Sequence, residues 1–74
     1  MKLTVAQKFW LNELWKAYTF TPNKALSVVY DKPPATVMKA LERKGLCQNV
    51  MDTFWKITNE GREQFNQMLK EEHP

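Results

Sequence analysis

Apolar residues recur at helical spacing over the first part of the chain. No glycine or proline interrupts the run from Thr4 to Tyr18, so we predict a helix over residues 4–18 with Thr4 as its N-cap. Its apolar arc is wider than the ~100° stripe that one core contact requires. This arc contains Leu3, Ala6, Trp10, Leu11, Leu14, Trp15, Ala17 and Tyr18, while Val5 and Phe9 lie off it. Either the rest of a small domain wraps this helix, or part of it meets a second subunit.

A second, shorter apolar pattern begins at Thr21-Pro22, a pair that is typical of a helix start. Leu26, Val29 and Tyr30 follow at i, i+3 and i+4 spacing. This spacing predicts a second helix over residues 22–30.

Two consecutive prolines then separate this helix from a third one. Lys32 precedes Pro33 and is therefore pushed out of the α conformation. The prolines can occupy the first turn of a helix over residues 33–44, where their missing N–H groups cost nothing. We expect Gly45 to end this helix in the left-handed conformation. The buried side of the helix is marked by Val37, Met38 and Leu41.

The pattern changes to a period of two after residue 45. Thr53, Trp55 and Ile57 alternate with Phe54 and Lys56, which predicts strands over residues 46–50 and 53–58. The turn between them lacks the Asn-Gly or Asp-Gly pair of a tight hairpin. Thr58 is expected to cap a last helix over residues 59–71, which buries Phe65, Met68 and Leu69. Together the elements predict one α+β domain over residues 1–74, mainly α-helical.

Composition narrows the setting in which this domain works. No stretch approaches the roughly 20 apolar residues of a membrane span, and the start of the chain lacks the apolar run and cleavage site of a signal peptide. Cys47 is the only cysteine, so no internal disulfide forms, which fits a reducing compartment. We therefore expect a cytoplasmic protein.

The net charge of +3 is unevenly distributed. Residues 1–50 carry a net charge of +5, and residues 51–74 carry −2. A basic first part is compatible with a nucleic-acid partner, although many basic proteins bind none.

Two sequence segments resemble a known family. The first is Leu41-Glu42-Arg43-Lys44-Gly45-Leu46, and the second is Trp55-Lys56-Ile57-Thr58-Asn59-Glu60-Gly61-Arg62. Their pattern is similar to the winged helix-turn-helix regulators of the MarR type and covers about residues 22–65. The resemblance implies a three-helix core, a β-hairpin wing and a C-terminal helix, with residues 33–44 as the recognition helix in a major groove. Gly61 would let the last helix approach the sheet closely.

The chain departs from this family pattern at two places. The tip of the wing, residues 49–53, contains no Lys or Arg, whereas family wings often carry basic residues. Pro33-Pro34-Ala35 stands where Ser- and Thr-rich residues usually face bases.

Candidate DNA contacts lie mainly on the predicted recognition helix. Thr36, Lys39 and Arg43 are spaced by three and four residues and share one side of it. Thr36 and Lys39 are candidates for base edges, and Arg43 for a phosphate. Phosphate contacts are also expected from Lys24 and Lys32, and Lys56 is the basic residue left to the wing. The alternative is that these cations form an ordinary solvated helix face.

We therefore expect a small DNA-binding transcriptional regulator that binds double-stranded DNA. A homodimer through residues 4–18, residues 59–71 or both would place two recognition helices on neighbouring half-sites. The alternative function is a protein-interaction module or phage-type inhibitor on the same scaffold. The bare wing tip, Phe54 and the excess of aromatic residues in the first helix favour this alternative.

Enzymatic chemistry is not expected from this sequence. It contains no Gly-rich phosphate loop and no visible Ser/His/Asp or paired-carboxylate set. His73 is the only histidine and, with Cys47, does not make a metal-ligand cluster. We expect no metal and no cofactor.

Overall fold

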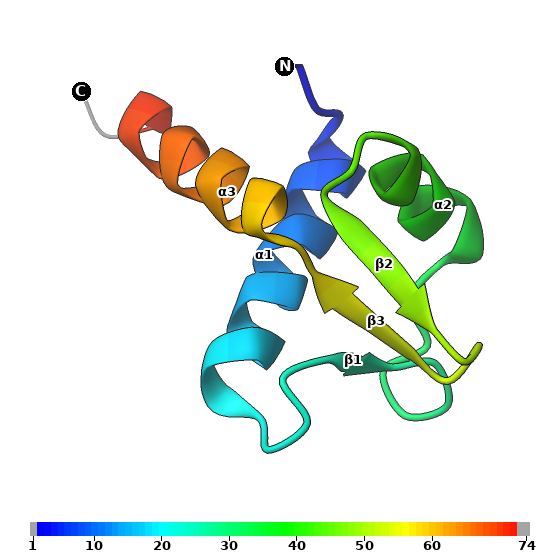
Figure 1. Cartoon of the computed structure of the whole chain (residues 1–74). Coiled ribbons are helices and arrows are strands. Elements are labelled where there is room, and N and C mark those ends of the chain that lie inside the picture. Colours follow the sequence, from blue (N-terminus) through cyan, green and yellow to red (C-terminus); the bar gives the residue numbers. More distant parts are fainter. Residues whose placement is uncertain (1, 73–74) are drawn as a thin grey trace.

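The computed structural model describes residues 2–72 and contains three helices and three short strands in that range (Figure 1). In chain order the elements are α1 (Val5–Phe20), β1 (Leu26–Ser27), α2 (Ala35–Arg43), β2 (Cys47–Val50), β3 (Phe54–Ile57) and α3 (Asn59–Glu72). The strands form one antiparallel sheet in the order β1-β3-β2. The fold is thus α+β and mainly helical, and its layout is compatible with that of a winged helix.

Helix α1 begins where the sequence predicts. The backbone N–H of Gln7 donates to Thr4 Oγ1 at 3.1 Å, and the N–H of Thr4 donates to Gln7 Oε1 at 3.0 Å, which makes a capping box. The helix runs two residues past the predicted end, to Phe20. The side that faces the core carries Leu11, Leu14 and Ala17, whereas Ala6, expected on the apolar side, is exposed.

The predicted helix over residues 22–30 is wrong. This segment forms turns around β1, and the backbone N–H of Val28 donates to the carbonyl of Thr53 at 2.9 Å. Val29 and Tyr30 are 65% and 88% exposed, so their spacing does not mark a core face. The segment is short and contains β-branched Val28 and Val29, and pairing with the hairpin gives its backbone a better partner than a helix would.

The loop before α2 is closed by its own hydrogen bonds. The N–H of Ser27 donates to Asp31 Oδ2 at 2.7 Å, and the N–H of Asp31 donates to the carbonyl of Ser27 at 2.9 Å. Lys32 follows with φ of 47°, in the left-handed region, and the chain then enters α2 through the two prolines.

Helix α2 lies inside the predicted range of residues 33–44 but starts later, because Pro34 is the extended N-cap residue. Its end matches the prediction: Gly45 has φ of 79°, and the N–H of Leu46 returns to the carbonyl of Leu41 at 3.0 Å. Met38 and Leu41 are fully buried, which anchors the helix on α1 and the sheet.

Strands β2 and β3 form a hairpin in which residues 51–53 connect the paired Val50 and Phe54. The N–H of Thr53 donates to the carbonyl of Val50 at 3.0 Å, and both central residues, Met51 and Asp52, have φ of 55°. Positive φ at both positions is typical of a type I′ turn, which suits the twist of a hairpin. The turn therefore forms without the Asn-Gly sequence that usually specifies it.

The core lies between α1 and the helix-facing side of the sheet. Trp55 and Ile57 point to this side of β3 and are buried, whereas Lys56 alternates to the other side and is exposed. On α3, Phe65 is buried and stacks on Trp15 of α1 with ring centroids 4.9 Å apart. Leu69, expected to be buried, is 37% exposed. Among residues 2–72, no helix is long and apolar enough to span a membrane.

Candidate functional site

The exposed side of α2 carries the three residues that the sequence places together. Thr36, Lys39 and Arg43 are all exposed, while Met38 and Leu41 on the opposite side are 0% exposed. A helix turns by about 100° per residue, so spacings of three and four keep the three side chains on one side. We call this set the α2 stripe.

The other predicted DNA contacts do not all join the α2 stripe. Lys32 is exposed in the loop that leads into α2. Lys24 instead lies beside Tyr18 of α1, with its Nζ 5.7 Å from the ring centroid, and Arg62 of α3 lies over the same ring at 4.5 Å. Lys56 pairs with Gln48 on the side of the sheet that faces away from the helices. The structure therefore groups Lys32 with α2 and places Lys24 and Lys56 elsewhere.

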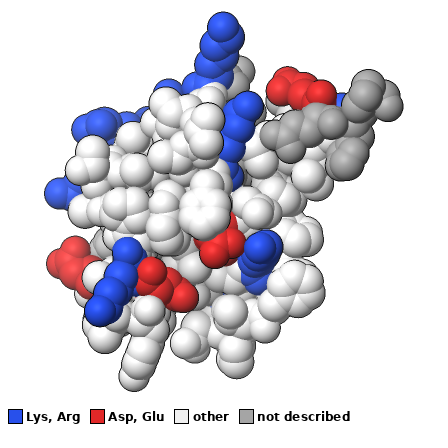
Figure 2. Space-filling view, turned by 180° about the vertical axis from the view of Figure 1, so that it is seen from behind, with Lys and Arg blue, Asp and Glu red and all other residues white. Residues whose placement is uncertain are grey.

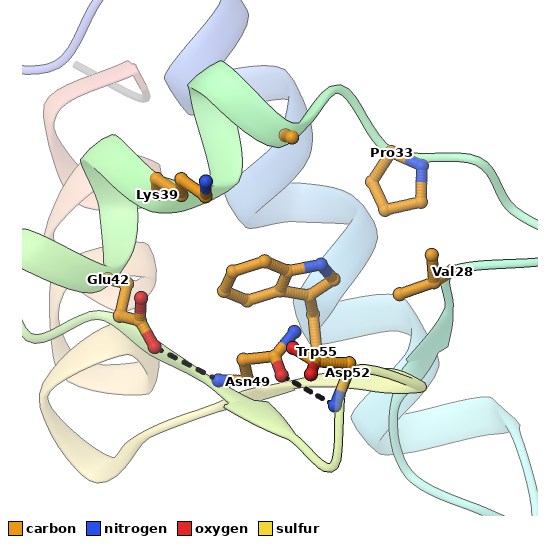
Figure 3. A pocket seen from close by; sticks show the side chains of 8 residues that line it. Val28, Pro33, Lys39, Glu42, Asn49, Asp52 and Trp55 are labelled. Atoms are coloured by element: carbon orange, nitrogen blue, oxygen red, sulfur yellow. Dashed lines mark hydrogen bonds between the residues drawn. The ribbon is translucent and has the colours of Figure 1, made fainter.

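A groove of about 440 Å³ runs along the edge of α2 (Figure 3). It separates α2 from the hairpin turn and from the loop before α2. Its lining consists of Val28, Pro33, Ala35, Lys39, Glu42, Asn49, Asp52 and Trp55. In Figure 3 the Trp55 indole lies between Lys39 on one side and Asn49 with Asp52 on the other. The groove thus combines an aromatic wall with charged and amide groups.

Hydrogen bonds position the polar groups of this groove. The N–H of Asn49 donates to Glu42 Oε2 at 3.2 Å, which ties β2 to α2. The N–H of Asp52 donates to Asn49 Oδ1 at 2.8 Å, which fixes the orientation of the Asn49 amide. Within residues 2–72 the salt bridge is Lys16–Glu13, on α1, so Lys39 is not ion-paired with either groove carboxylate.

Sequence reasoning found Lys39 but missed the rest of this groove. The sequence pattern places Glu42 only in the family resemblance and Trp55 only in the core. Asn49 and Asp52 belong to the predicted wing tip, residues 49–53, and both are typical turn residues because their side chains can bond nearby backbone groups. These turn residues predict where the turn is. They do not predict that the turn lies beside α2.

Cys47 is buried at the start of β2 and lies against α2. It is 2% exposed, and its Sγ is 3.5 Å from the carbonyl oxygen of Met38. Burial, together with the nearby negative charge of Glu42, raises the pKa of the Cys47 thiol to about 12. The thiolate is the reactive form, so this cysteine is an inert core residue. His73 lies outside the described residues, and residues 2–72 contain no group of three potential metal ligands.

Several large apolar side chains are exposed away from the groove. Tyr30 and Met51 are 88% and 89% exposed, on two loops that the Val28–Thr53 hydrogen bond joins. Val5 and Phe9, one helical turn apart on α1, are 86% and 51% exposed. Figure 2 shows the rear face, where basic side chains are scattered around a broad uncharged area and do not form one patch.

Comparison with known proteins gives no relative from which a function could be taken. No protein-family model matches the chain, and no curated protein or solved structure matches it.

Proposed function

We propose that this protein binds double-stranded DNA by placing α2 in a major groove, as a small transcriptional regulator. The observation that carries this proposal is the α2 stripe: Thr36, Lys39 and Arg43 are exposed together on a helix whose other side is anchored by fully buried Met38 and Leu41. A rigidly held helix with a polar, cationic outer side is what major-groove recognition requires.

The chemistry of the stripe assigns different contacts to its members. Lys39 can donate to guanine O6 or N7, and the Thr36 hydroxyl can contact a base edge. Arg43 stands at the C-terminal end of α2, where a phosphate is the nearer partner. Lys32, in the loop before α2, supplies a second phosphate contact. Lys24 and Lys56 lie away from this surface and are not part of the proposed interface.

A winged-helix arrangement related to the MarR type is part of this proposal. The sheet order β1-β3-β2 and the position of α2 before the hairpin support it. The element that would precede the recognition helix is here a set of turns, and the hairpin tip carries Met51 and Asp52 in place of cations. The wing therefore contributes little to DNA affinity, and α2 carries the interface.

A homodimer follows from the small size of this interface. One copy offers few phosphate contacts, whereas two copies can engage half-sites about 34 Å apart. The exposed Val5 and Phe9 on α1 offer an apolar surface for the second copy, and Leu69 on α3 offers another. A cytoplasmic location is part of the same proposal.

The test compares duplex binding by the wild type and by Lys39→Ala/Arg43→Ala. Fluorescence anisotropy with a random-sequence duplex at low salt should show binding that the double variant loses, while its thermal transition is retained because both side chains are exposed. Lys56→Ala, a cation removed from the other side of the sheet, is the matched control and should bind like the wild type. Each phosphate neutralised should contribute about −0.9 to the slope of log K against log salt. Unchanged binding by the double variant would exclude the α2 stripe.

A second candidate function is a protein-interaction module, and the exposed loop residues favour it. Tyr30 and Met51 are almost fully exposed although both side chains are large and apolar. If this surface binds a protein partner, the chain should not bind DNA even at low salt. Tyr30→Ser/Met51→Ser would then abolish binding to the partner, and Lys39→Ala/Arg43→Ala would not.

A further inference from the structure

The groove beside α2 has the size of a ligand site. Its volume of about 440 Å³ lies within the range of roughly 300–1,000 Å³ that is usual for small-molecule pockets. Its walls come from α2, from the loop before it and from the hairpin, which brings together residues as far apart as Val28 and Trp55. Trp55 is 6% exposed and held in the core, so it is a rigid part of the groove that presents only a small area of its indole.

The hairpin turn presents a hydrogen-bond donor and an acceptor side by side. Because Asn49 Oδ1 accepts from the N–H of Asp52, the amide nitrogen of Asn49 must point elsewhere. Figure 3 shows this nitrogen next to the carboxylate of Asp52, at the edge of the groove below the indole. The pair therefore offers one N–H donor and two adjacent carboxylate oxygens to a bound molecule.

Charge decides which class of molecule fits. A simple anion would meet Lys39 but would also face the carboxylates of Glu42 and Asp52. A simple cation would meet the carboxylates but would face Lys39. A molecule with an anionic group at one end and a planar edge of hydrogen-bond donors at the other satisfies both sides of the groove.

We propose that the groove binds a guanine nucleotide, with the base edge on Asn49 and Asp52, the base against the small exposed part of the Trp55 indole and the phosphate on Lys39. Guanine presents an acceptor, O6, next to two donors, N1–H and the 2-amino group. O6 matches the Asn49 amide nitrogen, and the two donors match the two oxygens of Asp52. Other bases offer a carboxylate only one of these donors on the Watson–Crick edge, so guanine is favoured over adenine, cytosine and thymine.

The first experiment follows the indole N–H signal of Trp55 and the backbone signals of residues 49–52 by NMR while GMP is added. GMP should shift these signals with saturation in the millimolar range or tighter. IMP, which lacks only the 2-amino group, should bind at least threefold more weakly, and AMP and inorganic phosphate should leave the signals in place. Equal shifts from GMP and IMP, or the same shifts from inorganic phosphate, would overturn the assignment.

Two variants separate the base contact from the phosphate contact. Asp52→Asn should weaken GMP binding at least tenfold and preserve the turn, because Asn tolerates the left-handed conformation of residue 52. Lys39→Gln should reduce GMP binding to the level of guanosine and leave guanosine binding unchanged. Lys44→Gln, which removes a cation that does not line the groove, is the control. An Asp52→Asn variant that binds GMP with the affinity of the wild type would contradict the proposal.

Free nucleotide and single-stranded nucleic acid share this chemistry, and both are tested. A tetranucleotide with one dG that binds more tightly than GMP identifies a strand as the source, and the reverse order identifies the free nucleotide. Arg43→Ala distinguishes this proposal from the proposed DNA function. This variant should weaken duplex binding and leave GMP binding unchanged. If neither probe moves the Trp55 signal, the groove is not a guanine site, whatever the outcome of the duplex experiment.

Discussion

The hydroxyl of Thr58 donates a hydrogen bond to the carbonyl oxygen of Gly45 at 2.6 Å. The hydroxyl oxygen of Thr58 in turn accepts from the backbone N–H of Gly61 at 3.0 Å. One side chain therefore caps the start of α3 and ties it to the exit from α2. Because α2 carries the proposed DNA interface, this junction holds the interface against the rest of the fold.

Thr58→Ala should lower the free energy of unfolding by about 1–2 kcal/mol, because both hydrogen bonds of the N-cap side chain are lost. Urea denaturation at neutral pH measures this change. Thr58→Ser keeps the hydroxyl and should lose much less. Equal losses for Ala and Ser would show that the methyl group, and not the hydroxyl, stabilises the junction.

Gly61→Ala should be more damaging than Gly45→Ala. A Cβ at Gly61 would overlap the carbonyl oxygen of Leu46 and come within 2.7 Å of Cγ1 of Ile57, so α3 would have to move away from the sheet. We expect a loss of about 3 kcal/mol or more in unfolding free energy. A Cβ at Gly45 meets no atom within 4 Å, and Ala there has only the strain of φ near 79°, about 1 kcal/mol. Thermal unfolding of both variants should rank them in this order.

The sequence predicted most of the fold because most elements carry local signals. The N-cap Thr4, the prolines before α2, Gly45 and the alternation in β3 each act on neighbouring residues, and the corresponding elements lie within a few residues of their predicted bounds. Residues 22–30 do not form the predicted helix because their conformation depends on pairing with β3 and the hairpin turn. That pairing joins residues such as Leu26 and Trp55, which are distant in the sequence.

The candidate site was predictable only where one helix defines it. Thr36, Lys39 and Arg43 share a side as soon as α2 forms, so their grouping followed from spacing alone. Lys24 was misplaced because the helix expected to carry it does not form. The groove forms only because Asn49 and Asp52 lie close to α2. A local sequence pattern cannot predict how close a turn lies to a helix that precedes it in the chain.

Met51→Asn should stabilise the hairpin. Met51 is 89% exposed and has φ of 55°, so the side chain gains nothing from burial while the backbone adopts a conformation that Met disfavours. Asn tolerates this conformation, and we expect a gain of about 0.5–1 kcal/mol, measured as a higher urea midpoint. Met51→Val should change stability in the opposite direction, because β-branched residues disfavour positive φ. A midpoint that Met51→Asn leaves unchanged or lowers would contradict a strained turn.

Cys47 should make stability fall at alkaline pH. Its thiol pKa is about 12 in the folded protein, against 9.0 as its ordinary value, because burial and Glu42 disfavour the thiolate. The folded state therefore keeps a proton that the unfolded chain releases. The contribution is complete below pH 9 and is lost between pH 9 and 12, by up to about 1.4 kcal/mol per pH unit.

The difference between the wild type and Cys47→Ala isolates this contribution, since lysine and tyrosine groups titrate in both proteins. Urea midpoints measured from pH 8 to pH 10.5 should fall more steeply in the wild type. Parallel curves for the two proteins would show that the thiol does not couple to folding.

Phe9→Glu should convert a dimer to a monomer if the second copy docks on α1. Phe9 is 51% exposed and Val5, one turn before it, is 86% exposed, so a charge at position 9 would be buried in such an interface but would remain in water in the monomer. Sedimentation at several concentrations should show a monomer for the variant where the wild type is a dimer, with an unchanged far-UV spectrum. Leu69→Glu makes the equivalent test on α3, where the wild-type side chain is 37% exposed. A dimer that survives Phe9→Glu and dissociates with Leu69→Glu assigns the contact to α3, and a dimer that survives both variants excludes both surfaces.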